Sequence, residues 1–502
     1  MDFFSDALKL YFAGIHYFFD PTMILLVLLG TIVGILNGSI PGLTSTMGLA
    51  VFTPLTFGMN PAKAIVFLIG IYQGSVYGGS ISAIIVNIPG TPSAIATGLD
   101  GYPMCQRGEA GRAIGFSTVA SFLGGLIGIA ALTFTAPSLA RVALGFSAEE
   151  YVALVVLGLS IIAYISPGSL LRGMIAGTLG LVLGTVGQDP MTAYPRFTFN
   201  LIGLFSGLEL IPALIGFFGV TEVLNQIGKK SAIRVFQEFK NIIPGLGVIA
   251  RLWALILRSS LIGVFVGATP AAGGSIAAMM AYGVEKRMSK DPEKWGKGTL
   301  EGIIAPESAN NASVGGAFIP MLTLGIPGDP MTAVLIGALM IHGLKTGPVL
   351  FTAHADFVSS IFIGNTLSLI FLLILGLCCA RYFAKMINSP SYILMPLILA
   401  FCMIGSYAIR NSLFDIYVAV FCGILGYLLN KVKIPVAPLT LGLVLGPMLE
   451  ENFRRVMILS EGKYTTLFTR PISASILMIT VGFLFYPHIR SWFKKKKGGQ
   501  RM

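Results

Sequence analysis

The chain has 502 residues, of which 55% are hydrophobic and only 11% are charged, and its mean hydropathy is +0.82. A soluble globular protein carries about 25% charged residues, so this composition excludes an ordinary soluble domain and predicts an integral membrane protein. The net charge of +12 comes from basic residues in short loops and at the end of the chain. This pattern is typical of cytoplasmic anchors, not of a nucleic-acid surface.

Long uncharged segments recur from one end of the chain to the other. A helix needs about 20 apolar residues to cross about 30 Å of hydrocarbon, and the segments lack the period-two alternation of barrel strands. We therefore predict an all-α integral membrane protein with about 10–14 transmembrane helices plus re-entrant or broken helices. The uncharged segments are residues 21–62, 64–99, 113–140, 151–171, 259–284, 357–380, 386–409 and 471–489.

Proline and glycine interrupt the first two of these segments. Residues 39–46 read SIPGLTST, and residues 87–93 read NIPGTPS. Each proline lacks an N–H group and disfavours helix in the residue before it, so a helix must break at these points. Irregular backbone at membrane depth survives only where protein or a water-filled cavity surrounds it. We therefore expect broken helices whose ends line a cavity.

The second half of the chain repeats these motifs in the same order. Gly34-x-x-x-Gly38-x-x-Pro41 recurs as Gly263-x-x-x-Gly267-x-x-Pro270. Pro89-Gly-Thr-Pro92 recurs as Pro327-Gly-Asp-Pro330, and a Ser-Val-x-Gly string, starting at Ser75 or Ser313, precedes both copies at the same spacing. Leu179-Gly-Leu-Val-Leu-Gly184 recurs letter for letter as Leu441 to Gly446. We predict two repeats, residues 1–240 and 241–502.

The separation between the two copies grows from the first motif to the last, which locates insertions in the second half. The last increase is about the length of one helix, which we place near 392–406. The second half is therefore expected to cross the membrane one time more than the first.

The basic residues predict how these repeats cross the membrane. The central segment 229–240 and the tail RSWFKKKKGGQRM are rich in Lys and Arg, so both are expected in the cytoplasm. The first ten residues, MDFFSDALKL, lack the features of a cleaved signal peptide. With one additional helix in the second half, the first half crosses an odd number of times. The amino terminus then lies outside, and the two repeats have inverted topology, as in many secondary transporters.

The broken helices are the predicted binding site. A helix N-terminus offers free N–H groups and a partial positive charge to a carboxylate, and a C-terminus offers carbonyl oxygens to a cation. The alternative is a proline kink in tightly packed helices, and for the breaks near 41 and 270 the two interpretations are equally favoured. The candidate substrate-binding residues are Ser39, Pro41, Gly42, Thr44, Ser45, Thr46, Asn87, Pro89, Gly90, Thr91, Pro92, Ser93, Thr269, Gly273, Gly274, Ser275, Pro327, Gly328, Pro330 and Thr332. The candidate cation-binding residues are Ser75, Ser80, Asn310, Asn311, Ser313 and Asp329.

A few charged residues lie within or near the apolar segments. Asp329 replaces Thr91 at the second break and is expected to bind a coupling cation or a proton, because ionisable groups inside a membrane are functional candidates. Glu307 is either functional or a loop residue at the membrane surface. We expect Arg107 and Lys345 either to attract anions or, more simply, to extend their charged ends to the membrane–water interface. Glu209 is expected to be paired or to line a cavity.

Several long strings resemble the large membrane subunit of the bacterial tripartite tricarboxylate transporters, the TctA family. The clearest are GSIPGLTSTMGLAVFTPLTFGMNP, YQGSVYGGSISAIIVNIPGTPSAIATGLDGYP and APESANNASVGGAFIPMLTLGIPGDPMTAVLIGALMIHGLKTGP. The resemblance implies a multi-pass secondary transporter of the bacterial inner membrane. It also implies a small membrane subunit of about four helices and a periplasmic solute-binding protein as partners, and uptake of citrate-like tricarboxylates or related carboxylates with Na+ or H+. No nucleic acid and no cofactor beyond the coupling ion is expected.

Three functional hypotheses follow. The first is symport of an organic polyanion with a cation, by an elevator movement inferred from analogy with other paired-hairpin transporters. The second is a passive anion channel. The third is a membrane-embedded enzyme, which would need a nucleophile with a base or a metal cluster; the four histidines are scattered, so neither catalytic residues nor a metal site is predicted.

Overall fold

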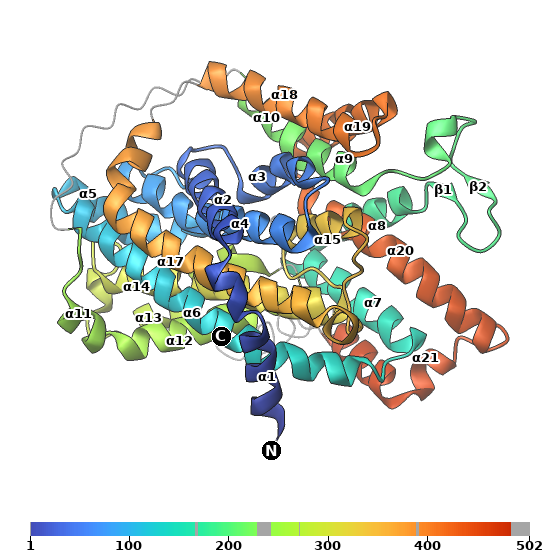
Figure 1. The fold of residues 1–502 in the computed structure, drawn as a ribbon, viewed down its shortest axis with the longest axis horizontal. Helices are drawn as coiled ribbons and strands as arrows, with labels where there is room; N and C mark the ends of the chain where they lie inside the picture. The colour runs from blue at the N-terminus through green and yellow to red at the C-terminus, as the bar shows by residue number, and fades with distance from the viewer. Residues whose placement is uncertain (1, 166–168, 228–241, 271, 388–390, 483–502) are drawn as a thin grey trace, which may run out of the picture. The chain divides into compact units, whose positions relative to one another are not determined.

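The computed structural model of the chain describes residues 2–165, 169–227, 242–270, 272–387 and 391–482. Over these residues the chain is almost entirely helical, and a two-stranded ribbon is the only sheet (Figure 1). The chain divides into two compact units. The first comprises Met1–Ala143 with Glu209–Leu428, and the second comprises Leu144–Leu208 with Leu429–Met502. Most of the predicted cytoplasmic segments, the centre and the tail, lies outside the described residues.

The first unit contains most of the helices. In chain order these are α1 (Asp2–Ala13), α2 (Pro21–Ser39), α3 (Ser45–Phe52), α4 (Pro61–Val86), α5 (Ile95–Gln106), α6 (Ala110–Ala143), α9 (Leu210–Leu214), α10 (Thr221–Gln226), α11 (Leu246–Arg251), α12 (Trp253–Gly267), α13 (Gly273–Met288), α14 (Glu301–Leu324), α15 (Pro330–Ile341), α16 (Leu350–Ala353), α17 (Ala355–Met386), α18 (Ser391–Arg410) and α19 (Leu413–Lys431). Short 3₁₀ turns cover Ile15–Phe19, Thr53–Thr56, Pro92–Ala94 and Pro292–Lys294, and a π-helical turn, Ile215–Val220, joins α9 to α10.

The lengths and composition of these helices are those of a membrane protein. Among the described residues, six helices are long and apolar enough to cross a bilayer: α2, α4, α6, α17, α19 and the part of α18 from Ile393 to Arg410. Shorter apolar helices are Leu170–Gly184, Leu210–Gln226, Trp253–Gly267, Pro330–Ile341 and Pro471–Gly482. The predicted all-α membrane fold with broken helices is confirmed. A helix also covers the segment 392–406, where we predicted one.

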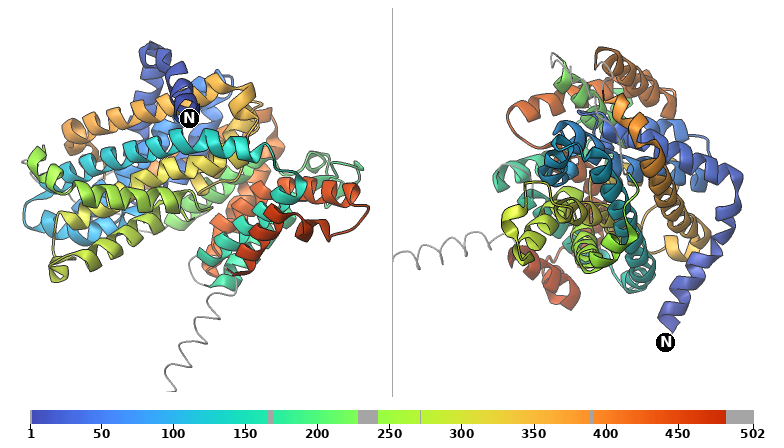
Figure 2. Two further views of the ribbon diagram at one scale, coloured as in Figure 1. Left: turned by 90° about the horizontal axis from the view of Figure 1, so that it is seen from below. Right: turned by 90° about the vertical axis from the view of Figure 1, so that its left-hand side faces the viewer.

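Two helices, α4 and α14, form the core of the first unit. Every residue of α4 from Ala64 to Ile85 is buried, and so is every residue of α14 from Gly302 to Thr323. Helices α2 and α17 pack against α4, while α6 and α12 pack against α14. Figure 2 shows α17, α6, α14 and α12 side by side. The polar side chains of α4 and α14 are therefore enclosed by other helices.

The packing in the first unit pairs equivalent positions of the repeated motifs. A Cβ atom at Gly38 of α2 would overlap the carbonyl oxygen of Ser75 in α4. In the same way, a Cβ atom at Gly267 of α12 would overlap the carbonyl oxygen of Ser313 in α14. Gly267 is the counterpart of Gly38 in the first repeated motif, and Ser313 is the counterpart of Ser75. Glycine is required at both positions because it lets the two backbones touch.

The second unit is built from α7 (Ala148–Ile165), α8 (Leu170–Gly184), α20 (Val436–Leu459) and α21 (Thr466–Thr469). The strands β1 (Gly187–Gln188) and β2 (Pro195–Arg196) pair antiparallel, and a 3₁₀ turn covers Ile202–Leu204.

The two copies of the repeated sextet pack against each other in this unit. A Cβ atom at Gly180 of α8 would overlap the carbonyl oxygen of Leu439, and one at Gly442 of α20 would overlap that of Gly177. When the two copies are aligned, Gly442 matches Gly180 and Leu439 matches Gly177, so the two contacts are reciprocal. Reciprocal contacts are the mark of a twofold relation, here between α8 and α20. The orientation of this axis in a membrane, and the division of the chain at residue 240, stay predictions.

Candidate functional site

The first Pro-Gly-x-Pro motif ends one helix and starts another. Helix α4 ends at Val86, and its C-cap Asn87 has the left-handed conformation with φ of 55°. The chain then runs through Pro89 and Gly90, and Pro92 takes the first position of the next helical segment, which leads into α5. A side chain at Gly90 would overlap the carbonyl oxygen of Gly38, so the break is packed directly on the end of α2.

The second motif has the same construction. Helix α14 ends at Leu324, its C-cap Gly325 has φ of 71°, and α15 begins at Pro330. Gly325 and Asn87 hold the same place, two positions before the first proline of their motifs. A Cβ atom at Gly328, the counterpart of Gly90, would lie 2.7 Å from the carbonyl oxygen of Gly267, at the end of α12. Both predicted breaks therefore exist, and each packs on the end of the helix that carries the first repeated motif, α2 or α12.

The N-termini after the two breaks differ in their chemistry. The Asp329 side chain accepts hydrogen bonds from the backbone N–H and the hydroxyl of Thr332, both at 2.8 Å, and Thr332 caps Asp329 in return. The hydroxyl of Tyr72 in α4 donates to the other Asp329 oxygen. The carboxylate of Asp329 therefore occupies the N-terminus of α15. At the first break, the side chain of Thr91 caps no backbone N–H, and its hydroxyl bonds that of Ser93 at 3.0 Å.

The other pair of motifs also breaks helices. Helix α2 ends at Ser39, Gly42 has φ of +93°, and the Thr44 hydroxyl accepts a bond from the N–H of Met47 to cap α3. Helix α12 ends at Gly267 and α13 starts at Gly273. The amide of Asn37 donates to the carbonyl of Thr44 at 3.0 Å, which ties this break to α2.

An unpaired amide faces the start of α13. Asn310 of α14 is 1% exposed, and neither atom of its amide has a hydrogen-bond partner in the structure. A Cβ atom at Gly274 would overlap its oxygen, and one at Gly273 would lie 3.5 Å from the Cβ of Asp329. Gly273, Gly274, Asn310 and Asp329, all predicted from the sequence, therefore lie close together.

Other predicted residues direct their hydroxyl groups to nearby backbone. The hydroxyls of Ser39, Ser75, Thr269 and Ser313 donate to carbonyl oxygens of α2, α12 or α14. Thr46 donates to the Sδ atom of Met331, so α3 contacts α15. Asn87 and Pro92 are exposed, and Ser275, Pro41 and Pro89 are half-buried. Ser45 and Pro327 are buried.

The predicted surface-loop alternative for Glu307 is wrong. Glu307 lies inside α14 and is fully buried. Its carboxylate accepts hydrogen bonds from Thr97 of α5, at 2.5 Å, and Ser121 of α6, at 2.8 Å. The local sequence APESANNASVGG did not exclude a loop, because it contains a proline and several residues that favour turns. Only the tertiary contacts decide between the two interpretations.

Asp100 is a buried polar residue that the sequence did not single out. It is fully buried in α5 and accepts hydrogen bonds from the backbone N–H groups of Gly296, Gly298 and Thr299, and from the hydroxyl of Tyr282. The guanidinium of Arg107 donates to the carbonyl oxygens of Lys297 and Gly298. The contacts of Asp100 and Arg107 together hold the basic loop between α13 and α14 against α5. Arg107 is therefore bound to backbone carbonyl oxygens of this loop.

Glu209 is paired, as the sequence predicted. Its carboxylate lies 3.1 Å from the guanidinium of Arg410, which also contacts the fully buried Asp415 at 2.5 Å. Lys345 is exposed in the turn after α15.

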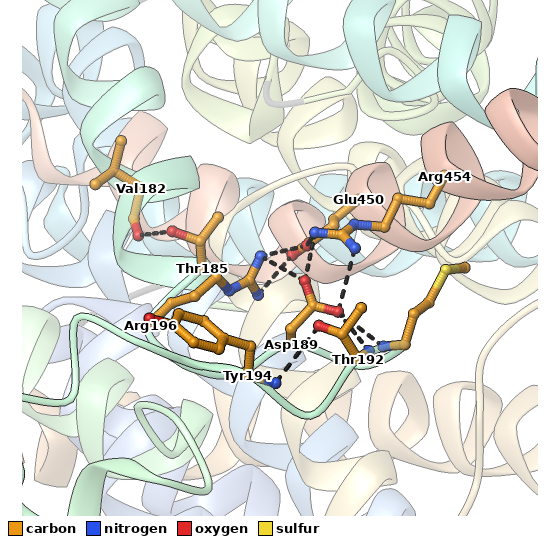
Figure 3. A network of polar contacts seen from close by, with 9 residues as sticks. Val182, Thr185, Asp189, Thr192, Tyr194, Arg196, Glu450 and Arg454 are labelled. Atoms are coloured by element: carbon orange, nitrogen blue, oxygen red, sulfur yellow. Dashed lines mark hydrogen bonds and ion pairs between the residues drawn. The ribbon is translucent and has the colours of Figure 1, made fainter. Parts of the chain in front are cut away.

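A second polar network lies in the second unit, in the segment between α8 and the 3₁₀ turn and on α20 (Figure 3). Arg196 contacts Glu450 through both of its terminal nitrogens, at 2.5 and 3.1 Å, and Arg454 bridges Glu450 and Asp189 at 3.0 and 2.5 Å. The backbone N–H of Thr192, followed by the N–H of Met191 and the charge of Arg454, lowers the pKa of Asp189 to about 2. This network fixes the β-ribbon to α20.

With the breaks and polar clusters placed, the chain can be compared with known proteins. Residues 24–441 match the family described as the tripartite tricarboxylate transporter TctA family. The chain belongs to this family. The resemblance seen in the sequence is therefore confirmed, and the TctA family together with the apolar helices makes the chain a multi-pass membrane protein of a transporter family.

Two proteins of Agrobacterium vitis are similar to this TctA-family chain. One, named "Uncharacterized 52.8 kDa protein in TAR-I ttuC' 3'region", is 38% identical over 486 residues, which are 95% of this chain and 96% of that protein. The other, "Uncharacterized protein in TAR-II ttuC' 3'region", is 43% identical over 236 residues, which are 46% of this chain and 96% of that protein. No solved structure matches the chain.

Proposed function

We propose that the chain is the large membrane subunit of a tripartite system that imports citrate-like tricarboxylates or related carboxylates across a bacterial inner membrane. Its partners are a small membrane subunit and a periplasmic solute-binding protein that delivers the substrate. Uptake is driven by symport with Na+ or H+. Membership of the TctA family supports this proposal, because the family consists of tricarboxylate transporters.

The observation that carries the proposal is the uncapped helix start at the first break. At Thr91 no side chain caps the segment that leads into α5, whereas at the equivalent position Asp329 caps α15 with its own carboxylate. A helix N-terminus carries a partial positive charge that attracts anions. The N–H of Ala94, the counterpart of Thr332, bonds the carbonyl oxygen of Thr91, so a substrate carboxylate here would be held by the hydroxyls of Thr91 and Ser93 and by this partial charge.

The start of α13 offers a further place for the substrate. Gly273 and Gly274 lie there with the unpaired amide of Asn310 beside them. An amide supplies both a donor and an acceptor, so it suits a hydroxycarboxylate. A buried polar group without a partner costs stability, and binding of such a ligand would satisfy it.

Uptake by the purified complex in proteoliposomes tests this function. Labelled citrate is added outside together with the solute-binding protein, under an inward Na+ gradient, an inward proton gradient, both gradients or neither. Symport predicts accumulation above the external concentration with at least one gradient and only equilibration with neither. Equilibration under every condition would favour the passive channel. Absence of any citrate flux, with an enzymatic product found instead, would favour the membrane-embedded enzyme.

A further inference from the structure

The carboxylate of Glu307 sits among hydroxyl groups contributed by three other helices. Thr97 of α5 donates to one of its oxygens and Ser121 of α6 donates to the other. Ser117 of α6 and Ser80 of α4 also interact with it, and their hydroxyls lie 2.9 Å from each other. All five residues are fully buried. The site therefore consists of a carboxylate and hydroxyl oxygens, with no nitrogen or sulfur ligand among these side chains.

The packing of α6 on α14 explains how these groups meet. Cβ atoms at Gly124 and Gly128 would overlap or touch the backbone of α14 at Ser308 and Ala312, so the two helices are in backbone contact. Ser117 and Ser121 are one turn apart on the same side of α6 and therefore both reach the facing helix. Gly124 and Gly128 allow this close approach of the two helices, which brings the hydroxyls of Ser117 and Ser121 to Glu307.

The charge of Glu307 finds no counterion among the described residues, since no Lys, Arg or His there forms an ion pair with it. A buried carboxylate without a partner is very costly, because the charge has lost its water. Either a proton or a bound cation can compensate this charge, because a hydroxyl donates to an ionised carboxylate and accepts from a protonated one. A shell made only of carboxylate and hydroxyl oxygens is the set of ligands that a hard cation prefers.

A second observation points to a ligand near this carboxylate. The residues that follow Glu307 in α14 include two further buried polar atoms without hydrogen-bond partners, the hydroxyl of Ser308 and the Oδ1 atom of Asn311. Asn311 lies one turn beyond Glu307 on the same side of the helix. Native structures contain few such atoms, and an ion or water commonly accounts for them.

We propose that Glu307 and its surrounding hydroxyls bind an alkali cation of the Na+ type, which serves as the coupling ion. Oxygen-only ligands select hard cations. One carboxylate neutralises a single positive charge, whereas a divalent ion would leave an uncompensated buried charge. This assignment rests on the proposed transport function and places the ion at a residue other than Asp329, whose oxygens are occupied by Thr332 and Tyr72.

Cation binding is tested on the purified full-length chain, independently of transport. A cation that binds the folded state raises the melting temperature. We expect NaCl to raise it by a few degrees relative to choline chloride in the wild type and in the control Glu301→Gln, which makes the same change in the first turn of α14. Glu307→Gln is expected to lose this Na+-specific rise. An undiminished rise in Glu307→Gln overturns the proposal.

A milder variant covers the case in which Glu307→Gln does not fold. Ser121→Ala removes one hydroxyl and leaves the carboxylate, so we expect roughly a 3- to 10-fold increase in the Na+ concentration that gives half of the melting shift. An unchanged Na+ curve for this variant contradicts the site.

Transport then separates this inference from the proposed function. In proteoliposomes, Glu307→Gln is expected to lose Na+-driven citrate accumulation and to keep citrate exchange at equal concentrations. Accumulation driven by a proton gradient alone, with no Na+ requirement in the wild type, overturns the Na+ assignment. Failure of the wild type to move citrate, with the Na+ melting shift intact in the wild type and absent in Glu307→Gln, would reject the transport function and leave the cation site in place.

Discussion

The hydroxyl of Tyr72 donates a hydrogen bond to the carboxylate of Asp329, although the two residues are 257 positions apart in the chain. Tyr72 lies in the middle of the buried helix α4, and Asp329 caps α15 at the break in the other half. Both side chains are 1% exposed. This contact joins the core helix of the first half to the interrupted helix of the second.

Loss of the Tyr72 hydroxyl should destabilise the second break. Tyr72→Phe leaves one Asp329 oxygen buried without its donor, which we expect to cost about 1–3 kcal/mol. Thermal unfolding in detergent measures the effect. In the Asp329→Asn background the same change should cost clearly less, because the charge that needs the donor is gone. Equal losses in both backgrounds would show that the two residues are not coupled.

Replacing Thr91 with aspartate should block the proposed carboxylate site. Thr91→Asp gives the first break the residue found at the second, so its side chain would cap the helix and repel an incoming anion. We expect citrate uptake in proteoliposomes to fall at least about tenfold, mainly through a higher KM. Thr91→Ser keeps a neutral hydroxyl and serves as the control. Wild-type uptake by Thr91→Asp would place the substrate elsewhere.

The glycines of the two breaks should not tolerate a side chain. A Cβ atom at Gly90 or Gly328 would run into the carbonyl oxygen of Gly38 or Gly267, respectively. Gly90→Ala and Gly328→Ala should each cost about 1–3 kcal/mol or more, since backbone atoms must move. The yield of monodisperse protein and its melting temperature report the loss. Gly283→Ala, where no atom lies within 4 Å, is the matched control.

The basic loop before α14 should come loose when Asp100 is removed. Asp100→Ala deprives the N–H groups of Gly296, Gly298 and Thr299 of their acceptor. We expect trypsin to cleave after Lys294 and Lys297 at least several times faster than in the wild type. Asp291→Ala changes an exposed carboxylate of the same loop that pairs with Lys294, so cleavage after Lys297 is compared and should stay near the wild-type rate. Equal rates in all three proteins would contradict the role of Asp100.

The polar network of Asp189, Arg196, Glu450 and Arg454 should weaken only in strong acid. The pKa of Asp189 is lowered to about 2, chiefly by the backbone N–H of Thr192. Since an unfolded aspartate has a pKa of about 3.9, the ionised group stabilises the fold above that pH. This contribution disappears as the pH falls from about 4 to about 2.

Melting curves of the wild type and Asp189→Asn across this range test the pH effect. The wild type should melt at the higher temperature near neutral pH, and the two curves should converge as the pH approaches 2. A gap between them that is unchanged down to pH 2 would mean that ionisation of Asp189 does not contribute.

The sequence by itself determined the membrane fold, the positions of the helix breaks and the repeated motifs. These depend on properties of single residues and their neighbours: apolar length sets where helices can cross the bilayer, and a proline stops a helix wherever it occurs. The repeated motifs even anticipated which glycines contact which backbone, at Gly38 with Ser75 and at Gly267 with Ser313.

Only the tertiary structure decided what the polar residues do. Glu307 accepts hydrogen bonds from Thr97, 210 positions away in the sequence, and from Ser121, 186 positions away. Asp100 accepts one from Thr299, in the loop before α14 and 199 positions away. No local pattern encodes such pairs, because they depend on how α4, α5, α6 and α14 pack. The sequence predicted Asp329 as a site for a coupling cation or a proton. In the structure its carboxylate accepts hydrogen bonds from Thr332 and Tyr72. Another carboxylate, that of Glu307, lies among hydroxyl oxygens of three other helices.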